Sequence, residues 1–269
     1  MSQNKKPRIF VVGNEKGGAG KTTCSMHLIV GLLDRGFRVS TIDTDSRQHS
    51  LTSYINNRDS YNKQNPDRQV VMPLHFHLRG VDNDNLSEKE MLEKNQFEQA
   101  FNKAKVNADF IVIDTPGSHT NLSRIAHSYA DTVITPINDS FVDLDVIAKA
   151  NAKDINSFTP SIYSQMLWEQ KMERAARDQG SIDWVVVRNR LSSLDAQNKR
   201  NVHEALDKIS KRIAFRVAPG FSERVIFREL FLHGLTLLDL DKANFIKSFS
   251  LSHVAARQEI RDFLESLKV

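Results

Sequence analysis

Short apolar runs, each bounded by turn residues, recur along the chain. They are RIFVVGN, RVSTIDTD, LHFHL, DFIVIDTPG, DTVITPIN, DWVVVRNR, IAFRVAPG and TLLDL. Several of these runs are continuous rather than alternating, which is typical of strands that are buried on both faces of a sheet. Helical patterns separate many of the runs, so we expect βαβ units. The prediction is an α/β fold with a mostly parallel, twisted sheet of about seven or eight strands and helices on both faces.

Three helical patterns are clear, over residues 22–35, 161–180 and 252–267. The first places its apolar residues on one side and is followed by Gly36, which is a typical helix end. Residues Asn56–Arg68, in contrast, are polar and rich in asparagine, which indicates a loop. The helical patterns and the apolar runs together account for most of the chain.

The length and composition suit one α/β domain. A chain of 269 residues that is 40% hydrophobic and 26% charged can bury a large core. We expect residues 1–7 to form a flexible tail and residues 8–269 to form a single domain. The one cysteine, Cys24, excludes an intramolecular disulfide and a four-cysteine metal or iron–sulfur site, which favours a reducing, cytoplasmic compartment.

The sequence VVGNEKGGAGKTT follows the first predicted strand and leads into the first predicted helix. Its end fits the phosphate-binding motif G-x-x-x-x-G-K-[ST], although Glu15 stands where the first glycine belongs. A strand, a glycine-rich loop and a helix in this order direct backbone N–H groups and the positive helix end toward phosphate oxygens. We therefore predict a triphosphate site formed by Gly17, Gly18, Ala19, Gly20, Lys21, Thr22 and Thr23.

Carboxylates at two predicted strand ends complete this site. Lys21 is expected to pair with the β- and γ-phosphates, and the Thr22 hydroxyl is expected to ligate Mg²⁺. Asp114 ends the apolar run FIVID, as the Mg²⁺-holding aspartate of a Walker B strand does. Asp43 and Asp45 lie two apart at another strand end, so both can point toward the ligand edge of the sheet. We predict that they stabilise Mg²⁺ and orient the attacking water, because a free aspartate is too acidic to be a strong base.

Basic charge is concentrated in one third of the chain. The stretch from Arg188 to Arg228 carries ten basic and four acidic residues, a charge of +6, whereas the whole chain has +4. This stretch is either a face that binds nucleic acid or an acidic partner protein, or only a helical surface that faces solvent. If the stretch binds DNA, Lys199, Arg200 and Arg224 are the predicted contacts to phosphates, without readout of base sequence.

Two other possibilities are disfavoured. His75 and His77 lie on one face of a predicted strand, but no third metal ligand follows at a suitable spacing. No apolar run approaches the roughly 18 residues that a membrane-spanning helix needs. The last predicted helix mixes acidic and basic residues evenly, whereas a helix that binds a membrane surface has a strongly basic polar face. We therefore expect no membrane partner.

These motifs resemble the ParA/MinD family of P-loop ATPases. The sequence KGGAGKTT is similar to the deviant Walker A motif of that family, in which Lys16 corresponds to the signature lysine that reaches the ATP of a partner subunit. Asp45 corresponds to the switch I aspartate required for hydrolysis, and Asp114 to the Walker B aspartate. Asn189 matches the position that reads the adenine edge, and Pro219 begins the loop expected to cover the base.

The charge of the loop supports the trans role of Lys16 independently. Lys21 already serves the phosphates of its own subunit, so a second cation from the same loop lies close to a negatively charged nucleotide face. By crossing an interface to a second triphosphate, this cation would stabilise developing charge as an arginine finger does. The alternative is an exposed lysine without such a role.

Within this family the chain is similar to the MipZ group of division-plane regulators. The resemblance is carried by VVGNEKGGAGKTT, FIVIDTPG, TPINDSFVD, DWVVVRNRL, RVIFRELF, GLTLLDL and AARQE, which span nearly the whole chain. It implies a homodimer formed with ATP and Mg²⁺, slow hydrolysis, binding to ParB and to non-specific DNA on the nucleoid, and inhibition of FtsZ assembly. The alternatives are a ParA-type chromosome or plasmid partition ATPase and a metabolic ATP-dependent ligase on the same fold.

Overall fold

A computed structural model describes residues 6–151, 154–191, 196–243 and 250–269, with side chains for all of these except 150, 151, 154–157 and 196–199. Of the predicted tail, residues 1–5 lie outside the described residues. Lys6 pairs with Asp178 at 3.7 Å, and Pro7 is buried. None of the described helices has an apolar stretch long enough to span a bilayer.

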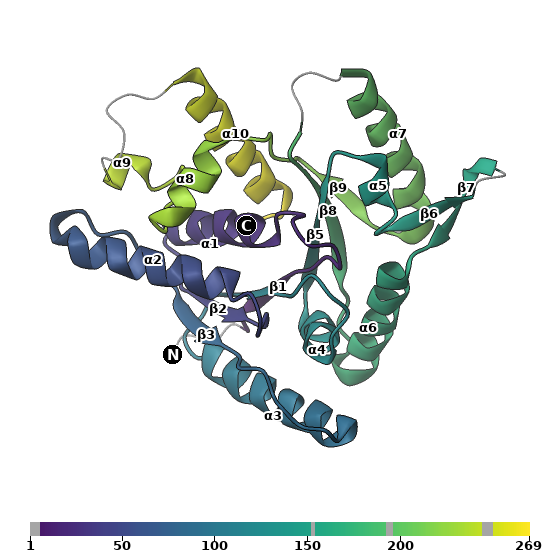
Figure 1. The fold of residues 1–269 in the computed structure, drawn as a ribbon, viewed down its shortest axis with the longest axis horizontal. Coiled ribbons are helices and arrows are strands. Elements are labelled where there is room, and N and C mark those ends of the chain that lie inside the picture. The colour runs from purple at the N-terminus through teal and green to yellow at the C-terminus, as the bar shows by residue number, and fades with distance from the viewer. Residues whose placement is uncertain (1–5, 152–153, 192–195, 244–249) are drawn as a thin grey trace.

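Seven parallel strands form one sheet in the order β3-β2-β4-β1-β5-β8-β9 (Figure 1). Every neighbouring pair in this sheet is parallel, so the predicted α/β fold is confirmed. The strands are β1 (Arg8–Val12), β2 (Val39–Asp43), β3 (Leu74–His77), β4 (Phe110–Asp114), β5 (Thr132–Asn138), β8 (Asp183–Asn189) and β9 (Arg216–Ala218).

Helices cover both faces of the sheet (Figure 1). One face carries α1 (Lys21–Asp34), α2 (Ser50–Gln64), α8 (Ile226–Leu232), α9 (Leu240–Ala243) and α10 (Leu251–Ser266). The other face carries α3 (Leu86–Ala104), α4 (Asn121–Tyr129), α6 (Ile162–Asp178) and α7 (Ala196–Ile213). In β1, Phe10 and Val12 enter the first core while Ile9 and Val11 enter the second. Burial on both faces explains why the strand sequences are continuously apolar.

The prediction that TLLDL forms an eighth strand is wrong. This segment forms a turn that leads into α9. Both the backbone N–H and the hydroxyl of Thr236 donate to Asp239 Oδ2, at 2.8 and 3.0 Å, which closes the turn. Asp239 is held in turn by the buried Arg58 guanidinium at 2.7 Å. The leucines of this run are buried although they do not form a strand. A run of five apolar residues does not show whether a buried segment is a strand or a turn.

The predicted loop over Asn56–Arg68 is also wrong, because most of it lies in α2, followed by a short 3₁₀ helix, η1 (Pro66–Arg68). Tyr54, Arg58 and Tyr61 recur at helical spacing and are all buried. Arg58 donates to the carbonyls of Val71 and Gly234 and to Asp239, so a charged residue lies at the centre of the packed face. The segment is an amphipathic helix whose buried face is partly polar. Its polar composition was therefore mistaken for that of a loop.

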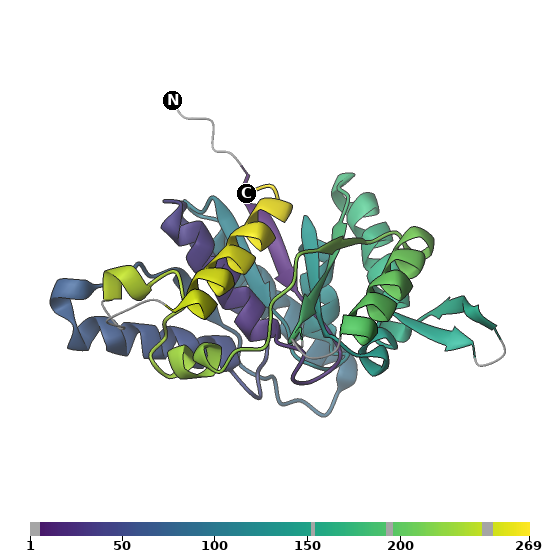
Figure 2. The ribbon, with the colours of Figure 1, turned by 90° about the horizontal axis from the view of Figure 1, so that it is seen from above.

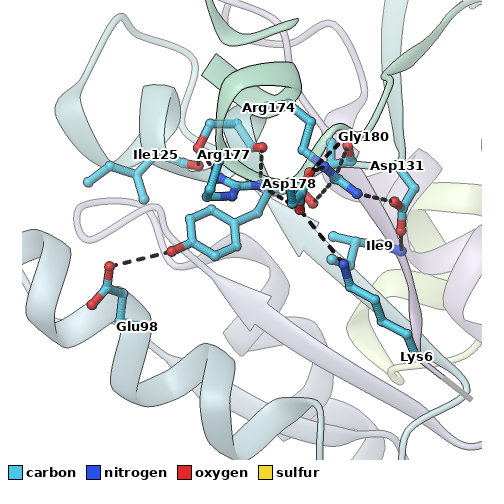
Figure 3. Close-up of polar contacts among 12 residues, drawn as sticks. Lys6, Ile9, Glu98, Ile125, Asp131, Arg174, Arg177, Asp178 and Gly180 are labelled. Carbon is cyan, nitrogen blue, oxygen red and sulfur yellow. Dashed lines mark hydrogen bonds and ion pairs between the residues drawn. The ribbon is translucent and has the colours of Figure 1, made fainter. Parts of the chain in front are cut away.

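Two further features bear on the surface of the molecule. The short helix α5 (Phe141–Leu144) leads into an antiparallel hairpin, β6 (Ala148–Asn151) and β7 (Asp154–Pro160), which projects from the body (Figure 2). Helix α6 follows the hairpin and is fixed by Arg174 near its carboxyl end (Figure 3). Arg174 is 5% exposed and binds Asp131 at 2.7 Å and Asp178 at 2.8 Å.

Candidate nucleotide site

The predicted phosphate loop connects β1 to α1 at the carboxyl edge of the sheet. Gly18 and Gly20 adopt the left-handed conformation, with φ of 73° and 89°, which glycine enters without steric strain. A Cβ on Gly20 would also overlap the side-chain nitrogen of Asn189. Six of the seven predicted loop residues line a cleft of 1220 Å³, namely Gly17, Gly18, Gly20, Lys21, Thr22 and Thr23. The remaining one, Ala19, is buried beneath it.

Lys21 is enclosed by the loop that precedes it. Its Nζ donates to the carbonyl oxygen of Lys16 at 3.1 Å. The turn after β4 packs against the same place, since a Cβ on Gly117 would lie 3.1 Å from this Nζ. Burial lowers the pKa of Lys21, and the carboxylates of Asp114 and Asp45 oppose that shift. The charged amine of Lys21 therefore lies beside the backbone N–H groups of the loop, where an anionic ligand would bind.

Asp114 ends β4 and accepts two hydroxyl hydrogen bonds. Thr22 Oγ1 donates to one carboxylate oxygen at 2.9 Å, and Ser25 Oγ donates to the other at 2.8 Å. Burial, and secondarily the nearby Asp43, raises the pKa of Asp114 to about 7. A hydroxyl and a carboxylate are the hard oxygen donors that Mg²⁺ prefers, and an added cation would offset this desolvation, so the residues present fit Mg²⁺. Sequence reasoning missed Ser25, although it lies one helical turn after Thr22.

Asp43 and Asp45 have different surroundings. Asp43 is fully buried; one oxygen accepts the backbone N–H of Asp45 at 3.0 Å, and the other accepts both the N–H and the hydroxyl of Thr52 at 2.9 and 2.7 Å. Asp45 lines the cleft, and its Oδ1 accepts the N–H groups of Arg47 and Gln48. Asp43 therefore positions the turn that carries Asp45, and its predicted role as a Mg²⁺ ligand stays a prediction.

Lys16 is held within its own subunit. Its Nζ bonds to Asp143 Oδ1 on α5, and the other Asp143 oxygen accepts the backbone N–H of Asn138 at 3.0 Å. The Asn14 side chain fixes the backbone here, because it accepts from Lys16 N and donates to the Pro136 carbonyl, both at 2.6 Å. Sequence reasoning missed Asp143, which belongs to the TPINDSFVD stretch that carries the family resemblance.

The opposite end of the cleft is a hollow beside the start of α1. It is lined by Gly20, Thr23, Asn189, Arg190, Ser222, Glu223, Arg224, Phe227, Arg228 and Phe231. Asn189 donates to the Ala19 carbonyl at 3.0 Å, so the structure brings it to the phosphate loop. Pro219 is exposed and does not line this hollow, which is instead bordered by the residues that follow it. Two aromatic rings, Phe227 and Phe231, give the hollow an apolar side on which a base can stack.

The three predicted DNA contacts come from opposite faces of the sheet. Arg200 is exposed on α7, where the side chain of Lys199 lies outside the described residues. Arg224 precedes α8 and is bound on the other face, donating to Glu259 and to the Ser252 hydroxyl, both at 2.7 Å. The three residues therefore do not share one structural element.

Comparison of the sequence with known proteins gives matches along its length. A family model described as ATPase MipZ matches residues 8–269. The chain is 32% identical over 118 residues to the maintenance of carboxysome distribution protein A of Halothiobacillus neapolitanus, covering 44% of each chain. It is 26% identical over 160 residues to the sporulation initiation inhibitor protein Soj of Bacillus subtilis, covering 53% of this chain and 62% of Soj. The matched segments thus span less than two thirds of these relatives.

Solved structures share the fold. The complex of Cyanothece McdA with ATP has a TM-score of 0.63 at 16% identity and covers 98% of this chain and 97% of that chain. The MinC:MinD cell division protein complex of Aquifex aeolicus has a TM-score of 0.57 at 18% identity, with 97% and 95% covered. With a family model matched from Arg8 to the last residue and the phosphate loop, Asp45 and Asp114 gathered in one cleft, the chain belongs to the MipZ family of ATPases.

Proposed function

We propose that this chain is a switch that binds ATP with Mg²⁺, dimerises on it and is reset by hydrolysis. The observation that carries the proposal is the pairing of Lys16, which lies in the phosphate loop next to the first residue that lines the cleft. Its side chain is 38% exposed and is bound to Asp143 on α5, while Lys21 of the same loop faces the cleft. A cation that is half in solvent and held by one side chain is free to exchange that partner for the triphosphate of a second subunit.

Each residue of the cleft has a defined task in this proposal. The loop N–H groups and Lys21 bind the phosphates, and Thr22 and Asp114 hold Mg²⁺, which neutralises developing charge when bound. Asp45 orients the attacking water, and the partner subunit's lysine at the position of Lys16 stabilises charge on the leaving phosphates. Asn189 and the two phenylalanines beside it receive the base.

The finer function follows the family. We propose that the ATP dimer binds ParB and non-specific DNA on the nucleoid in the cytoplasm and inhibits FtsZ assembly, which positions the division site. Membership in the MipZ family supports this choice. The alternative is a ParA-type partition ATPase, which the similarity to Soj and to a Borrelia burgdorferi plasmid partition protein bound to AMPPNP supports.

Light scattering after size exclusion, with and without a non-hydrolysable ATP analogue, tests the switch. We expect the mass of one chain without nucleotide and of two chains with the analogue. An Asp45→Ala variant is expected to accumulate the dimer with ATP itself, because hydrolysis no longer separates the subunits. A wild-type hydrolysis rate in this variant would refute the role of Asp45. Sedimentation of purified FtsZ polymers then separates the two functions, since a partition ATPase leaves FtsZ assembly unchanged.

A further inference from the structure

Helix α6 has two apolar faces, and only one of them packs against the sheet. Tyr163 and Leu167 are buried on the inner face. Ile162, Trp168 and Met172 are 64%, 63% and 49% exposed on the outer face. At about 100° per residue, these three side chains lie within roughly 120° of the helix circumference. Large apolar side chains gathered on one exposed face mark a contact surface more often than scattered ones do.

Trp168 also borders a groove between α6, the end of β7 and the carboxyl end of α7, which we call the α6–α7 groove. The groove has a volume of 590 Å³. Its apolar lining comes from Pro160, Trp168, Trp184 and Ile213, and its cations are Lys171 and Arg212. Glu169 is its one acidic lining residue. The combination of an apolar lining and two cations defines the chemistry of a ligand that would fit.

Lys171 lacks a carboxylate partner in the described part of the chain. Its Nζ donates to the Ala214 carbonyl at 3.3 Å and lies 5.8 Å from the centre of the Trp184 ring. Burial lowers the pKa of Lys171, and the carboxylate of Asp183 opposes that shift without pairing with it, since Asp183 is paired with Arg216 at 2.8 Å. A partly desolvated ammonium without a counter-ion gains more from an incoming carboxylate than a solvated one does.

Arg212 also lacks a carboxylate partner, because it forms no ion pair with any acid that the structure describes. It is exposed on the last turn of α7, next to the groove. Two unmatched cations that flank one apolar surface are complementary to a segment that carries both acidic and large apolar residues.

The groove is preformed and lies away from the nucleotide. Arg174 and Arg177 fix α6 through the carbonyls of Tyr129 and Ser128 in α4 and the side chain of Asp131, which directly precedes β5, as Figure 3 shows. Trp184 is the second residue of β8, whereas Asn189 at its other end meets the phosphate loop. Asn189 lies five positions after Trp184 along the strand, a distance of about 16 Å. A ligand in the groove would therefore leave the nucleotide cleft open.

We propose that the α6–α7 groove binds an acidic segment of a partner protein through a large apolar anchor residue. The anchor packs between Trp168 and the floor formed by Trp184 and Ile213, and the flanking carboxylates pair with Lys171 and Arg212. Binding is independent of ATP, because the two sites lie at opposite ends of β8. This site goes beyond the proposed switch and does not depend on it.

A phage-displayed library of random twelve-residue peptides, panned on the full chain, tests the proposal. We expect the enriched peptides to combine Asp or Glu with Phe, Leu or Trp. The chain has two tryptophans, and both line the groove, so intrinsic fluorescence reports its occupancy directly. An enriched peptide, synthesised without Trp or Tyr, is expected to shift the emission of Trp168 to shorter wavelength in a saturable way.

Variants locate the site. Trp168→Ala and Lys171→Met are expected to weaken peptide binding, measured by anisotropy of a labelled peptide, about 10-fold or more each. Leu232→Ala, which truncates an equally exposed apolar residue on α8, is the matched control and is expected to leave binding unchanged. Binding of the ATP analogue should be the same in all three variants, which shows that they are folded.

Several outcomes would overturn the proposal. They are no enrichment above the bait-free control, enrichment of basic or uncharged peptides, or full binding by Trp168→Ala. Competition between the peptide and the ATP analogue would place the peptide in the nucleotide cleft instead. A doubled mass without nucleotide that Trp168→Ala abolishes would mean that a second copy of the chain occupies the groove.

Discussion

Two ion pairs in this molecule have nearly the same carboxylate burial but opposite cation exposure. In the Arg58–Asp239 pair, the side chains are 1% and 5% exposed, and Arg58 also donates to two backbone carbonyls. In the Lys16–Asp143 pair, the lysine is 38% exposed and the aspartate 4%. The first joins α2 to the segment before α9. The second joins the phosphate loop to α5.

The difference shows how burial decides whether an ion pair is permanent or exchangeable. Removing either member of the Arg58–Asp239 pair leaves a charge in a low-dielectric interior, so the pair cannot open while the protein stays folded. Opening the Lys16–Asp143 pair leaves the lysine in water at little cost, and the buried Asp143 keeps the backbone N–H of Asn138 as a partner. A triphosphate also offers the lysine more negative charge than one carboxylate does. One pair stabilises the fold, and the other leaves a lysine available for the trans role that we propose.

The largest effect is expected from breaking the permanent pair. Arg58→Met leaves Asp239 buried and uncompensated, so we expect the free energy of unfolding to fall by about 3–5 kcal/mol. Urea denaturation followed by circular dichroism measures this change. Arg38→Met is the matched control, because Arg38 pairs with Asp109 at 2.8 Å on the surface and is 63% exposed. The control should lose much less stability than Arg58→Met, because solvent screens a surface pair. Equal losses in the two variants would show that burial does not decide how much an ion pair stabilises this fold.

Breaking the exchangeable pair from the lysine side is expected to affect dimerisation more than stability. Lys16→Ala should lower the free energy of unfolding by about 1–2 kcal/mol, because Asp143 stays buried but keeps its hydrogen bond from the Asn138 N–H. The ATP-dependent dimer should require about 30-fold more protein, since two symmetry-related trans contacts worth roughly 1 kcal/mol each are lost. Light scattering at several protein concentrations measures this shift. Wild-type dimers with the ATP analogue would sink the trans role of Lys16.

Replacing the aspartate of the same pair should strengthen dimerisation, whereas replacing the lysine should weaken it. Asp143→Asn keeps an acceptor for the Asn138 N–H but removes the charge that holds Lys16, so a larger fraction of lysines is free to cross to a second subunit. We expect dimers to form at a protein concentration up to about 5-fold lower, which corresponds to at most roughly 1 kcal/mol. Weaker dimerisation than in the parent protein would show that Asp143 supports the dimer instead of competing with it.

The smallest effect is expected from a cation that is exposed on the surface. Arg200→Gln should weaken binding to a labelled random DNA duplex only a few-fold and reduce the salt dependence by about one counterion. The slope of log affinity against log salt, measured by anisotropy, tests this. A slope unchanged from the parent protein would exclude Arg200 from the phosphate contacts.

Most of the sheet was predictable from the sequence because strands buried on both faces have a strong local signal. Seven of the eight apolar runs form strands, and the helix after the phosphate loop begins within one residue of its expected start. The errors concern elements whose apolar or polar character has a tertiary cause. The buried turn at Thr236–Asp239 and the helix around Arg58 depend on each other, since each supplies hydrogen-bond partners to the other.

In the candidate nucleotide site, too, some residues were predictable from the sequence and others were not. The motif predicted the adjacent residues from Gly17 to Thr23, and the strand ends predicted Asp45 and Asp114. The structure brings all of these except the buried Ala19 to the lining of one cleft. Ser25 and Asp143 were missed because their roles depend on which side chain faces them across the fold. Pro219 does not line the hollow, whereas Ser222 and Glu223 of the loop that it begins do, and its predicted role stays a prediction.

The sequence alone determined the phosphate loop, the parallel sheet and the presence of two lysines in one loop, because these follow from residue type and spacing along the chain. Only the tertiary structure decided that Lys21 is enclosed and Lys16 is paired with Asp143. The same holds for the unmatched Lys171 beside two tryptophans. The physical reason is that exposure and counter-charge set the energy of a cation, and both arise from segments that are remote in sequence.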